Sequence, residues 1–463
     1  MPNLRIVSDN ALERATLTAS STAGALAVGN LAAAQVYPVW RATGREARVT
    51  AAFADAEPIG FVGLPFCNLS PTARMRVRAS GEAAITNNRI YTEAFDNAAW
   101  TKGAVTVTAN AAAAPDCAVT ADRLNETPTS GTHYLQQGIG SVAVGDVRTE
   151  SVFVRRDTGE QYVRLVLGAG FTNVGAYFDL ASGQVASASN CTARMDTHPG
   201  GWYRCSITAT ATAVGSSSIQ IFSHRTSAGA AYAGDGAAGI LVWGAMGVVG
   251  SGTGSYYPSG ASAGTRPVGY IDSWQSYDYD SGLVRACPAP AVRLRGFTPA
   301  QAASAYAYGG GAYARHWLPV EIAARGLVVE ILDPDNVQGY VEAGCMVASS
   351  FWSLSYNASA ASVTMVDRTE ISRSAAGGQL ADPGTMSRKV PVDLRAMPPA
   401  DRATFLNLVR NSRAHPILLS VFPMHADVEL ERDFMVYGRR TKDSDLAYQF
   451  MNAYATTLEV EEI

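Results

Sequence analysis

Charged residues are scarce in this sequence: Asp, Glu, Lys and Arg make up only 16% of its 463 residues, and the formal net charge is −4. No run of Lys or Arg with interleaved aromatic residues is present, which argues against nucleic acid as a partner. Apolar runs of about 18 residues are also missing, so no transmembrane helix is predicted. The first 17 residues lack a basic segment followed by an apolar one, and we expect no cleaved secretion signal.

Signatures of metal and enzyme chemistry are scarce as well. The six cysteines form no C-x-x-C pair, which disfavours a zinc site. They are Cys67, Cys117, Cys191, Cys205, Cys287 and Cys345. We expect buried free thiols; a bond between Cys191 and Cys205 is the alternative, which synthesis in a reducing compartment disfavours. No GxSxG, HExxH or Cys/His pattern makes a convincing catalytic signature, and the six histidines are scattered. The expectation is therefore a protein that is not an enzyme.

In place of charge, the sequence has apolar and small residues. Hydrophobic residues make up 47% of the chain, and Gly, Ala, Ser and Thr are abundant, a composition typical of β-sandwiches. Residues 87–266 alternate apolar and polar side chains in stretches such as AVTVTANAA, QYVRLVLGAG and SSIQIFSHR. This pattern predicts about seven to nine strands joined by short turns. We interpret the block as a complete jelly-roll-type β-sandwich.

The flanking segments share a different pattern. Residues 1–86 and 267–350 alternate short apolar runs with polar turns, which indicates one discontinuous β-sandwich that the middle block interrupts at a loop. Residues 351–463 combine strands with a helix predicted over 398–413, and indicate a small α+β unit. The expected fold class is mainly β: a discontinuous β-sandwich interrupted by a second, jelly-roll-type β-sandwich and followed by a small α+β C-terminal domain.

The middle block resembles a known family. YTEAFDNAAWTK at 91–102, APDCAVTADRLNE at 114–126, GWYRCSITATA at 201–211 and SYYPSGASAGTR at 255–266 are similar to the carbohydrate-binding-module-like sandwiches inserted in bacteriophage tail, baseplate and head-spike proteins. Two departures are Cys117, where a glycine is usual, and Met246, where a glutamine often follows WGA; the second removes a polar contact to a ligand. The flanks resemble a discoidin-like sandwich of phage tail proteins, and residues 351–463 resemble a tail or baseplate assembly domain.

The resemblance implies a structural protein of a phage tail tip or baseplate, located in the virion tail and made in the host cytoplasm. Its partners would be other tail and baseplate proteins, further copies of this chain within the virion, and a host-surface polysaccharide contacted by the inserted module during adsorption. The alternatives are a polysaccharide-degrading tail enzyme with an attached binding module, and a purely structural decoration without ligand. Many weak sites on one particle would raise avidity.

Sugar binding by a sandwich needs flat aromatic faces beside hydrogen-bonding side chains. The candidate glycan-binding residues are Trp100, Tyr134, Gln136, Tyr162 and Arg164. Tyr134 and Gln136 are two residues apart in HYLQQ, so on a strand they share one face. Trp100 follows the turn-like stretch FDNAA, which makes exposure more plausible, although packing in the core is still favoured over a role in binding.

Sandwiches of this kind often carry a structural Ca²⁺, which binds six to eight oxygen ligands. The candidate metal ligands are Glu93, Asp96 and Asp235. No contiguous DxDxDG loop accompanies them, and solvated carboxylates in turns are the alternative. No other cofactor is expected.

Overall fold

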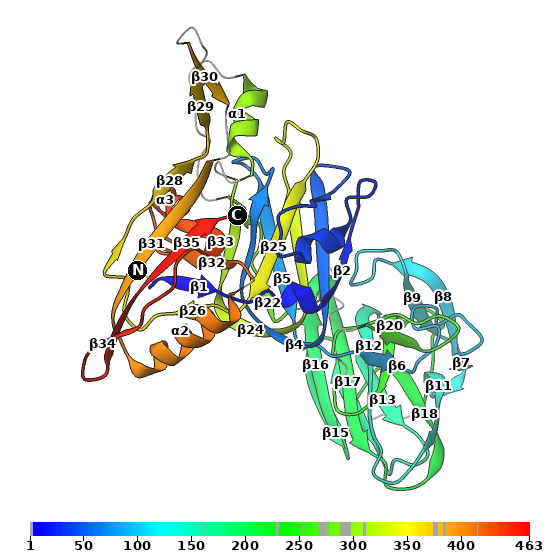
Figure 1. The fold of residues 1–463 in the computed structure, drawn as a ribbon. Helices are drawn as coiled ribbons and strands as arrows, with labels where there is room; N and C mark the ends of the chain where they lie inside the picture. Colours follow the sequence, from blue (N-terminus) through cyan, green and yellow to red (C-terminus); the bar gives the residue numbers. More distant parts are fainter. Residues whose placement is uncertain are drawn as a thin grey trace. The chain divides into compact units, whose positions relative to one another are not determined.

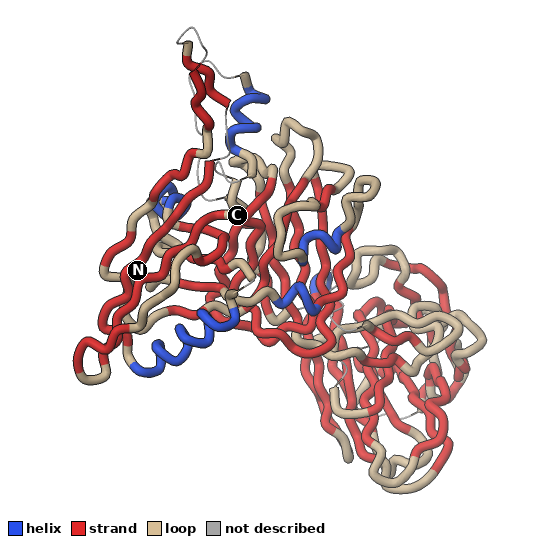
Figure 2. The backbone as a smooth tube through the Cα atoms, viewed as in Figure 1, coloured by secondary structure: helices blue, strands red, loops and turns tan. Residues whose placement is uncertain are grey.

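The computed structural model describes residues 3–159, 161–227, 231–252, 254–267, 275, 277–287, 298–308, 312–373, 378–382, 386–413 and 415–463. The chain divides into two compact units: Met1–Gly81 together with Tyr277–Ile463 form the first, and Glu82–Ser276 form the second. Antiparallel strands dominate both, which confirms the mainly β fold class (Figures 1 and 2). No described helix is long and apolar enough to cross a membrane.

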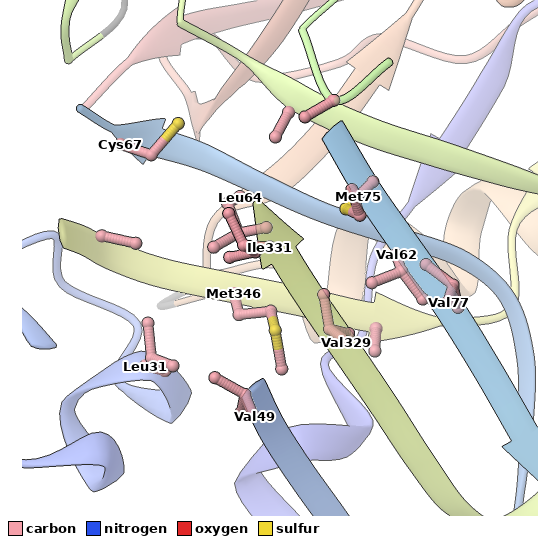
Figure 3. Close-up of a cluster of buried hydrophobic side chains, with 14 of the residues drawn as sticks. Leu31, Val49, Val62, Leu64, Cys67, Met75, Val77, Val329, Ile331 and Met346 are labelled. Atoms are coloured by element: carbon pink, nitrogen blue, oxygen red, sulfur yellow. The ribbon is translucent and has the colours of Figure 1, made fainter. Parts of the chain in front are cut away.

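An eight-stranded sheet in the first unit joins residues from both sides of the insertion. Its order is β22-β5-β24-β4-β25-β3, with β2 paired to β4 and β23 paired to β5. The strands are β2 (Ala15–Ala19), β3 (Trp40–Arg41), β4 (Glu46–Cys67), β5 (Arg74–Ser80), β22 (Tyr279–Asp280), β23 (Val284–Arg285), β24 (Ala314–Leu332) and β25 (Glu342–Ser349). Because β24 pairs with both β4 and β5, strands before and after the second unit share one sheet. Val49, Met75 and Val329 belong to its apolar core (Figure 3).

The first unit also contains a nine-stranded sheet, in the order β26-β1-β32-β33-β35-β31-β27, with β28 paired to β31 and β34 paired to β35. The strands are β1 (Arg5–Val7), β26 (Trp352–Ser353), β27 (Ala360–Ala361), β28 (Thr364–Asp367), β31 (Met386–Met397), β32 (Ile417–Ser420), β33 (Met435–Arg440), β34 (Ala447–Phe450) and β35 (Ala453–Glu462). A separate hairpin is formed by β29 (Glu370–Arg373) and β30 (Gln379–Asp382). This sheet contains most of the strands of residues 351–463.

The described helices are short. They are α1 (Pro299–Tyr306), α2 (Pro399–Asn411) and α3 (Val428–Asp433), with 3₁₀ turns η1 (Ala11–Arg14), η2 (Val28–Ala32) and η3 (Pro199–Gly201). The predicted helix 398–413 is α2, which begins one residue later and buries Phe405 and Leu408. Pro399 suits the first turn, where the missing N–H costs no helical hydrogen bond.

The expected boundary at residue 350 differs from the structure. Strand β1, at the N-terminal end of the chain, lies between β26 and β32 in the sheet of residues 351–463. One apolar cluster also joins the two sheets of this unit, with Val7, Phe61, Val347 and Leu418 among its members. Residues 351–463 are therefore not a separate domain: β1 satisfies the backbone hydrogen bonds of two of their strands, and their core is shared.

The second unit is a β-sandwich of two six-stranded antiparallel sheets. The first, called the β18 sheet, has the order β15 (Gln184–Ser189), β14 (Gly175–Asp179), β13 (Tyr162–Leu167), β18 (Gly215–His224), β11 (His133–Val142) and β7 (Thr101–Gly103). The second, called the β12 sheet, has the order β16 (Thr192–His198), β17 (Trp202–Thr210), β12 (Val147–Thr158), β20 (Gly239–Val249), β9 (Ala121–Glu126) and β8 (Val105–Ala112). Inward-facing side chains of both sheets, including Leu135, Ile221, Val152 and Val242, form one core.

The two ends of the second unit lie beside each other. Strand β6 (Ile85–Asn87) pairs with β21 (Gly264–Arg266), and Arg266 forms an ion pair with Glu82 at 2.7 Å. A further two-stranded ladder, β10 (Ser130–Gly131) with β19 (Tyr232–Ala233), lies within the unit. Within the first unit, Tyr279 of β22 pairs with Ala79 of β5. After the second unit, the chain therefore re-enters the first unit beside β5, the last strand of the first unit before the insertion.

All six cysteines carry free thiols. Cys67, Cys205, Cys287 and Cys345 are buried, as expected of structural thiols, and Cys191 is half-buried. Cys117 is exposed, contrary to the expectation of burial, because it lies in a surface turn with a positive φ of 71°.

Candidate functional site

The outward face of the β18 sheet gathers aromatic and polar side chains from four strands. Alternation along each strand sends Leu135, Val163 and Ile221 into the core and their neighbours outward. We call these outward residues the platform: Tyr134, Gln136, Tyr162, Arg164, Tyr177, Gln220, Phe222 and His224. Four of the five predicted glycan-binding residues, Tyr134, Gln136, Tyr162 and Arg164, thus come together on one face.

One row of the platform crosses the sheet at right angles to the strands. Tyr134 pairs with Phe222, Phe222 with Arg164, and Arg164 with Tyr177. The rings of Tyr134 and Phe222 are 5.2 Å apart between centroids. The Arg164 guanidinium carbon lies 5.0 Å from the Tyr177 ring centroid and 5.9 Å from that of Phe222. Arg164 is therefore held between two aromatic rings by cation–π attraction.

A pair of amides forms the next row of the platform. Gln136 and Gln220 are directly opposite each other on β11 and β18, and the Gln220 amide nitrogen donates to the Gln136 side-chain oxygen at 2.9 Å. Both side chains are half-buried. Among the described residues, the Gln136 amide nitrogen and the Gln220 side-chain oxygen have no protein partner, so this row offers one donor and one acceptor group beside the aromatic row.

His224 lies at the end of β18 and is only 2% exposed. Its ring stacks on Phe222 at 5.7 Å and lies 5.6 Å from Tyr177. Burial, together with the positive charge of Arg164, lowers the pKa of His224 to about 4. The imidazole is therefore neutral at pH 7 and adds no second positive charge to the platform.

Two buried polar atoms of the platform lack a partner. Within the described part of the chain, neither Nε of Arg164 nor Nε2 of His224 has a hydrogen-bond partner. The Nε atoms of Arg89 and Arg148 in the same unit also lack a hydrogen-bond partner among the described residues, so this feature by itself does not distinguish the platform. Tyr162, another of the predicted glycan-binding residues, lies on the same face, where it pairs with Asp179 of β14 and His224 of β18.

Trp100 does not belong to this face: it packs in the core, as its alternative assignment had it, and its inclusion among the glycan-binding residues is wrong. Its side chain is 1% exposed and packs on Phe95 with ring centroids 4.8 Å apart. The indole N–H donates to the backbone oxygen of Tyr91 at 3.1 Å. The turn that precedes Trp100 directs the ring inward, where a large apolar surface is stabilised most, so no ring face is left for a sugar.

The three predicted metal ligands do not come together in a group that fits a calcium site. Glu93 accepts a hydrogen bond from the Tyr256 hydroxyl, and burial raises the pKa of its carboxyl. Asp96 is exposed. Asp235 pairs with Arg225 at 2.9 Å, and the amides of Ala238 and Ala237 hold its pKa at about 2. No group of three or more His, Cys, Asp or Glu side chains in the described ranges could hold a metal ion.

Sequence reasoning missed half of the platform: Tyr177, Gln220, Phe222 and His224. A signal for three of them was present, because SSIQIFSHR alternates as HYLQQ does and places Gln220, Phe222 and His224 on one face. What the sequence lacked was the pairing of β18 with β11 and β13, which brings that face beside Tyr134 and Arg164.

Comparisons with known proteins give partial likenesses only. No family model and no curated protein matches the sequence. Among solved structures, the chain is similar to the enzymatically active domain of bacteriophage CBA120 tailspike protein 4, at 12% identity and a TM-score of 0.23, over 35% of this chain and 21% of that chain. It is also similar to the CBM22-1 xylan-binding domain of Paenibacillus barcinonensis Xyn10C, at 14% identity and a TM-score of 0.22, over 37% of this chain and 96% of that domain.

A third similarity is to the CBM22-1–GH10 modules of Clostridium thermocellum xylanase 10B, at 13% identity and a TM-score of 0.21. The match covers 38% of this chain and 30% of the xylanase chain. The chain thus spans less than a third of both the tailspike and the xylanase chains.

Proposed function

We propose that the second unit is a carbohydrate-binding module and that the platform is its glycan-binding face. The observation that carries the proposal is the row Tyr134, Phe222, Arg164 and Tyr177, in which aromatic rings lie beside a guanidinium on the outward face of one sheet. The two tyrosines and Arg164 are half-buried, whereas Phe222 is only 8% exposed and supports its neighbours from below. Aromatic rings stack on the CH groups of a pyranose, while Arg164 and the Gln136–Gln220 pair bind its hydroxyls. The module acts by binding and not by catalysis.

The wider proposal is that the chain is a structural component of a phage tail tip or baseplate, present in several copies and located in the virion tail. Its first unit would hold it among other tail proteins, and its second unit would contact host-surface polysaccharide during adsorption. The sequence resemblance described above supports this context. A face of this kind binds weakly on its own, and several copies on one particle would raise the apparent affinity by orders of magnitude.

A polysaccharide array tests the binding proposal. The full chain, biotinylated and displayed on streptavidin, is applied to printed bacterial capsular and O-antigen polysaccharides. We expect retention on at least one polysaccharide and a loss of about tenfold or more in apparent affinity for Tyr134→Ala and Tyr177→Ala. The matched control is Tyr448→Ala, which removes a tyrosine that is 63% exposed in the first unit and should bind as the parent does.

Three outcomes decide between this function and its rivals. Retention that disappears with the platform variants and survives in the control supports the module. Absence of retention on every polysaccharide, with the variants and parent alike, supports a structural decoration without ligand. Release of reducing sugar from a bound polysaccharide overturns the proposal that the chain is not an enzyme. Mass spectrometry of purified virions then tests the location in the tail.

A further inference from the structure

Arg164 is the centre of the platform and has no counter-ion among the described residues. On the outward face of the β18 sheet, two side chains are ionised at pH 7: Arg164 on β13 and Asp179 at the end of β14. The described residues of β7, β11, β15 and β18 add no charged side chain to this face, because His224 is neutral at pH 7. Asp179 accepts the backbone N–H groups of Ala181 (2.8 Å) and Ser182 (3.3 Å) and so caps a turn. No described carboxylate forms an ion pair with Arg164.

The surroundings of Arg164 differ from those of the buried arginines in this unit, which bond to other protein groups. Arg89 pairs with Glu150 at 3.4 Å and Arg266 with Glu82 at 2.7 Å, while Arg204, which has no carboxylate partner among the described residues, donates to Ser151 and to the backbone oxygen of Gly254. Arg164 has only ring faces on both sides, and its buried Nε has no acceptor in the described part of the chain. A guanidinium fixed between two rings keeps its planar fork of N–H donors in one orientation.

We propose that the platform selects a glycan bearing a carboxylate on its sugar ring, such as a uronic acid, and that Arg164 is the residue that binds this carboxylate. The inference rests on the proposed glycan-binding function and names its ligand class. A carboxylate accepts two parallel N–H groups from a guanidinium, and such charge-assisted bonds are about twice as strong as neutral ones. Tyr134 and Tyr177 on either side of Arg164 then stack on the neighbouring sugars.

The experiment compares each acidic polysaccharide with its own carboxyl-reduced form. Polygalacturonate, alginate, hyaluronan and polysialate are immobilised beside their reduced counterparts, in which the carboxylate is an alcohol, together with the neutral polymers dextran and galactomannan. The full chain is displayed on streptavidin as before. We expect at least one native acidic polymer to bind about tenfold or more tightly than its reduced form. The polysialate arm distinguishes a sialic acid from a uronic acid as the source of the carboxylate.

Variants at one position connect this preference to Arg164. Arg164→Gln removes the charge and should bind native and reduced polymers equally weakly, whereas Arg164→Lys keeps the charge, loses the paired donors and should recover only part of the preference. Arg194→Gln, on an arginine whose side chain is 75% exposed on β16 of the other sheet, is the matched control and should keep the parent preference. Circular dichroism confirms that each variant is folded.

The possible results separate the inference from the function on which it rests. Binding to neutral or reduced polymers as tight as to native ones, sensitive to Tyr134→Ala, overturns the carboxylate preference and leaves the glycan-binding function in place. A preference that Arg164→Gln leaves intact also overturns it. Binding to none of the acidic or neutral polymers counts against both the inference and the proposed function.

Discussion

The ring of Tyr134 lies directly over Gly103 on the neighbouring strand β7, so closely that a methyl group at Gly103 would overlap it. Packing of an aromatic ring over a glycine on the adjacent strand covers backbone that would otherwise be open, and fixes the ring in place. The glycine therefore sets where the first ring of the platform stands.

Gly103→Ala is expected to displace the Tyr134 ring and to weaken glycan binding about tenfold, with a loss of about 1–3 kcal/mol in the free energy of unfolding from overpacking. Gly138→Ala is the matched control, because a methyl group there meets nothing within 4 Å on the same sheet. Affinity on the array and urea unfolding measure the two effects. Equal behaviour of the two variants would show that Gly103 does not position Tyr134.

A second prediction concerns the buried pair of Arg89 and Glu150 in the sandwich. Burial raises the pKa of Glu150 to about 7, from 4.5 in an unfolded chain, although Arg89 and Arg148 oppose the rise. The folded state therefore binds a proton at Glu150 more tightly than the unfolded chain does. The stabilisation from this protonated carboxyl is complete below pH 4.5 and is lost as the pH rises through 7. Between those limits the unit should lose on the order of 3 kcal/mol from this group.

Glu150→Gln imitates the protonated carboxyl and should abolish this dependence on pH. Urea unfolding between pH 4.5 and 8, with pulsed hydrogen exchange of β12 to report on the second unit alone, provides the measurement. Asp96→Asn removes an exposed carboxylate of the same unit and should keep the parent profile. A Glu150→Gln variant that loses stability with rising pH as steeply as the parent would contradict the assignment to Glu150.

The third prediction concerns the ion pair that links β24 to α3 in the first unit. Arg315 donates from Nε to Glu431 at 2.9 Å, and the Glu431 side chain is fully buried. Arg315→Ala leaves this carboxylate without its counter-ion and should cost about 3–5 kcal/mol of unfolding free energy. The exposed pair of Arg194 with Asp196 provides the comparison, and Arg194→Ala should cost less than about 1 kcal/mol.

Chemical denaturation of the full chain, with pulsed exchange of β24 and β16 peptides, measures both losses. The double variant Arg315→Leu/Glu431→Leu should be less destabilised than Arg315→Ala, because no uncompensated charge remains buried. Similar losses in Arg315→Ala and Arg194→Ala would show that burial of Glu431 has no energetic consequence.

The fourth prediction is that the two units fold independently. The backbone N–H of Gly81 donates to Asp278 at 2.6 Å, so the two chain ends left by removing residues 82–276 lie side by side and a short Gly-Ser linker can join them. The fragment 82–276 keeps the β6–β21 pair at its own ends. Each piece should show a cooperative thermal transition and a β-type circular dichroism spectrum; an unfolded or aggregated piece would show that it depends on the other.

Part of the platform is predictable from the sequence. The period-two alternation of HYLQQ places Tyr134 and Gln136 on one face, since successive side chains of a strand point to opposite sides. Alternation does not indicate which face is buried, however, and an aromatic side chain that follows a turn can point into the core or toward solvent. Trp100 shows this: its stretch has the sequence of a surface turn, and the ring is in the core.

The sequence by itself determined the elements: strands with alternating faces, a helix within residues 398–413, and a block of low charge able to form a sandwich of its own. Only the tertiary structure decided which strands became neighbours. It placed β1 among strands more than 300 residues away, and it brought Arg164 between Tyr177 and Phe222. The physical reason is that strand pairing uses backbone groups common to every residue, so the choice of partner depends on how whole faces pack together.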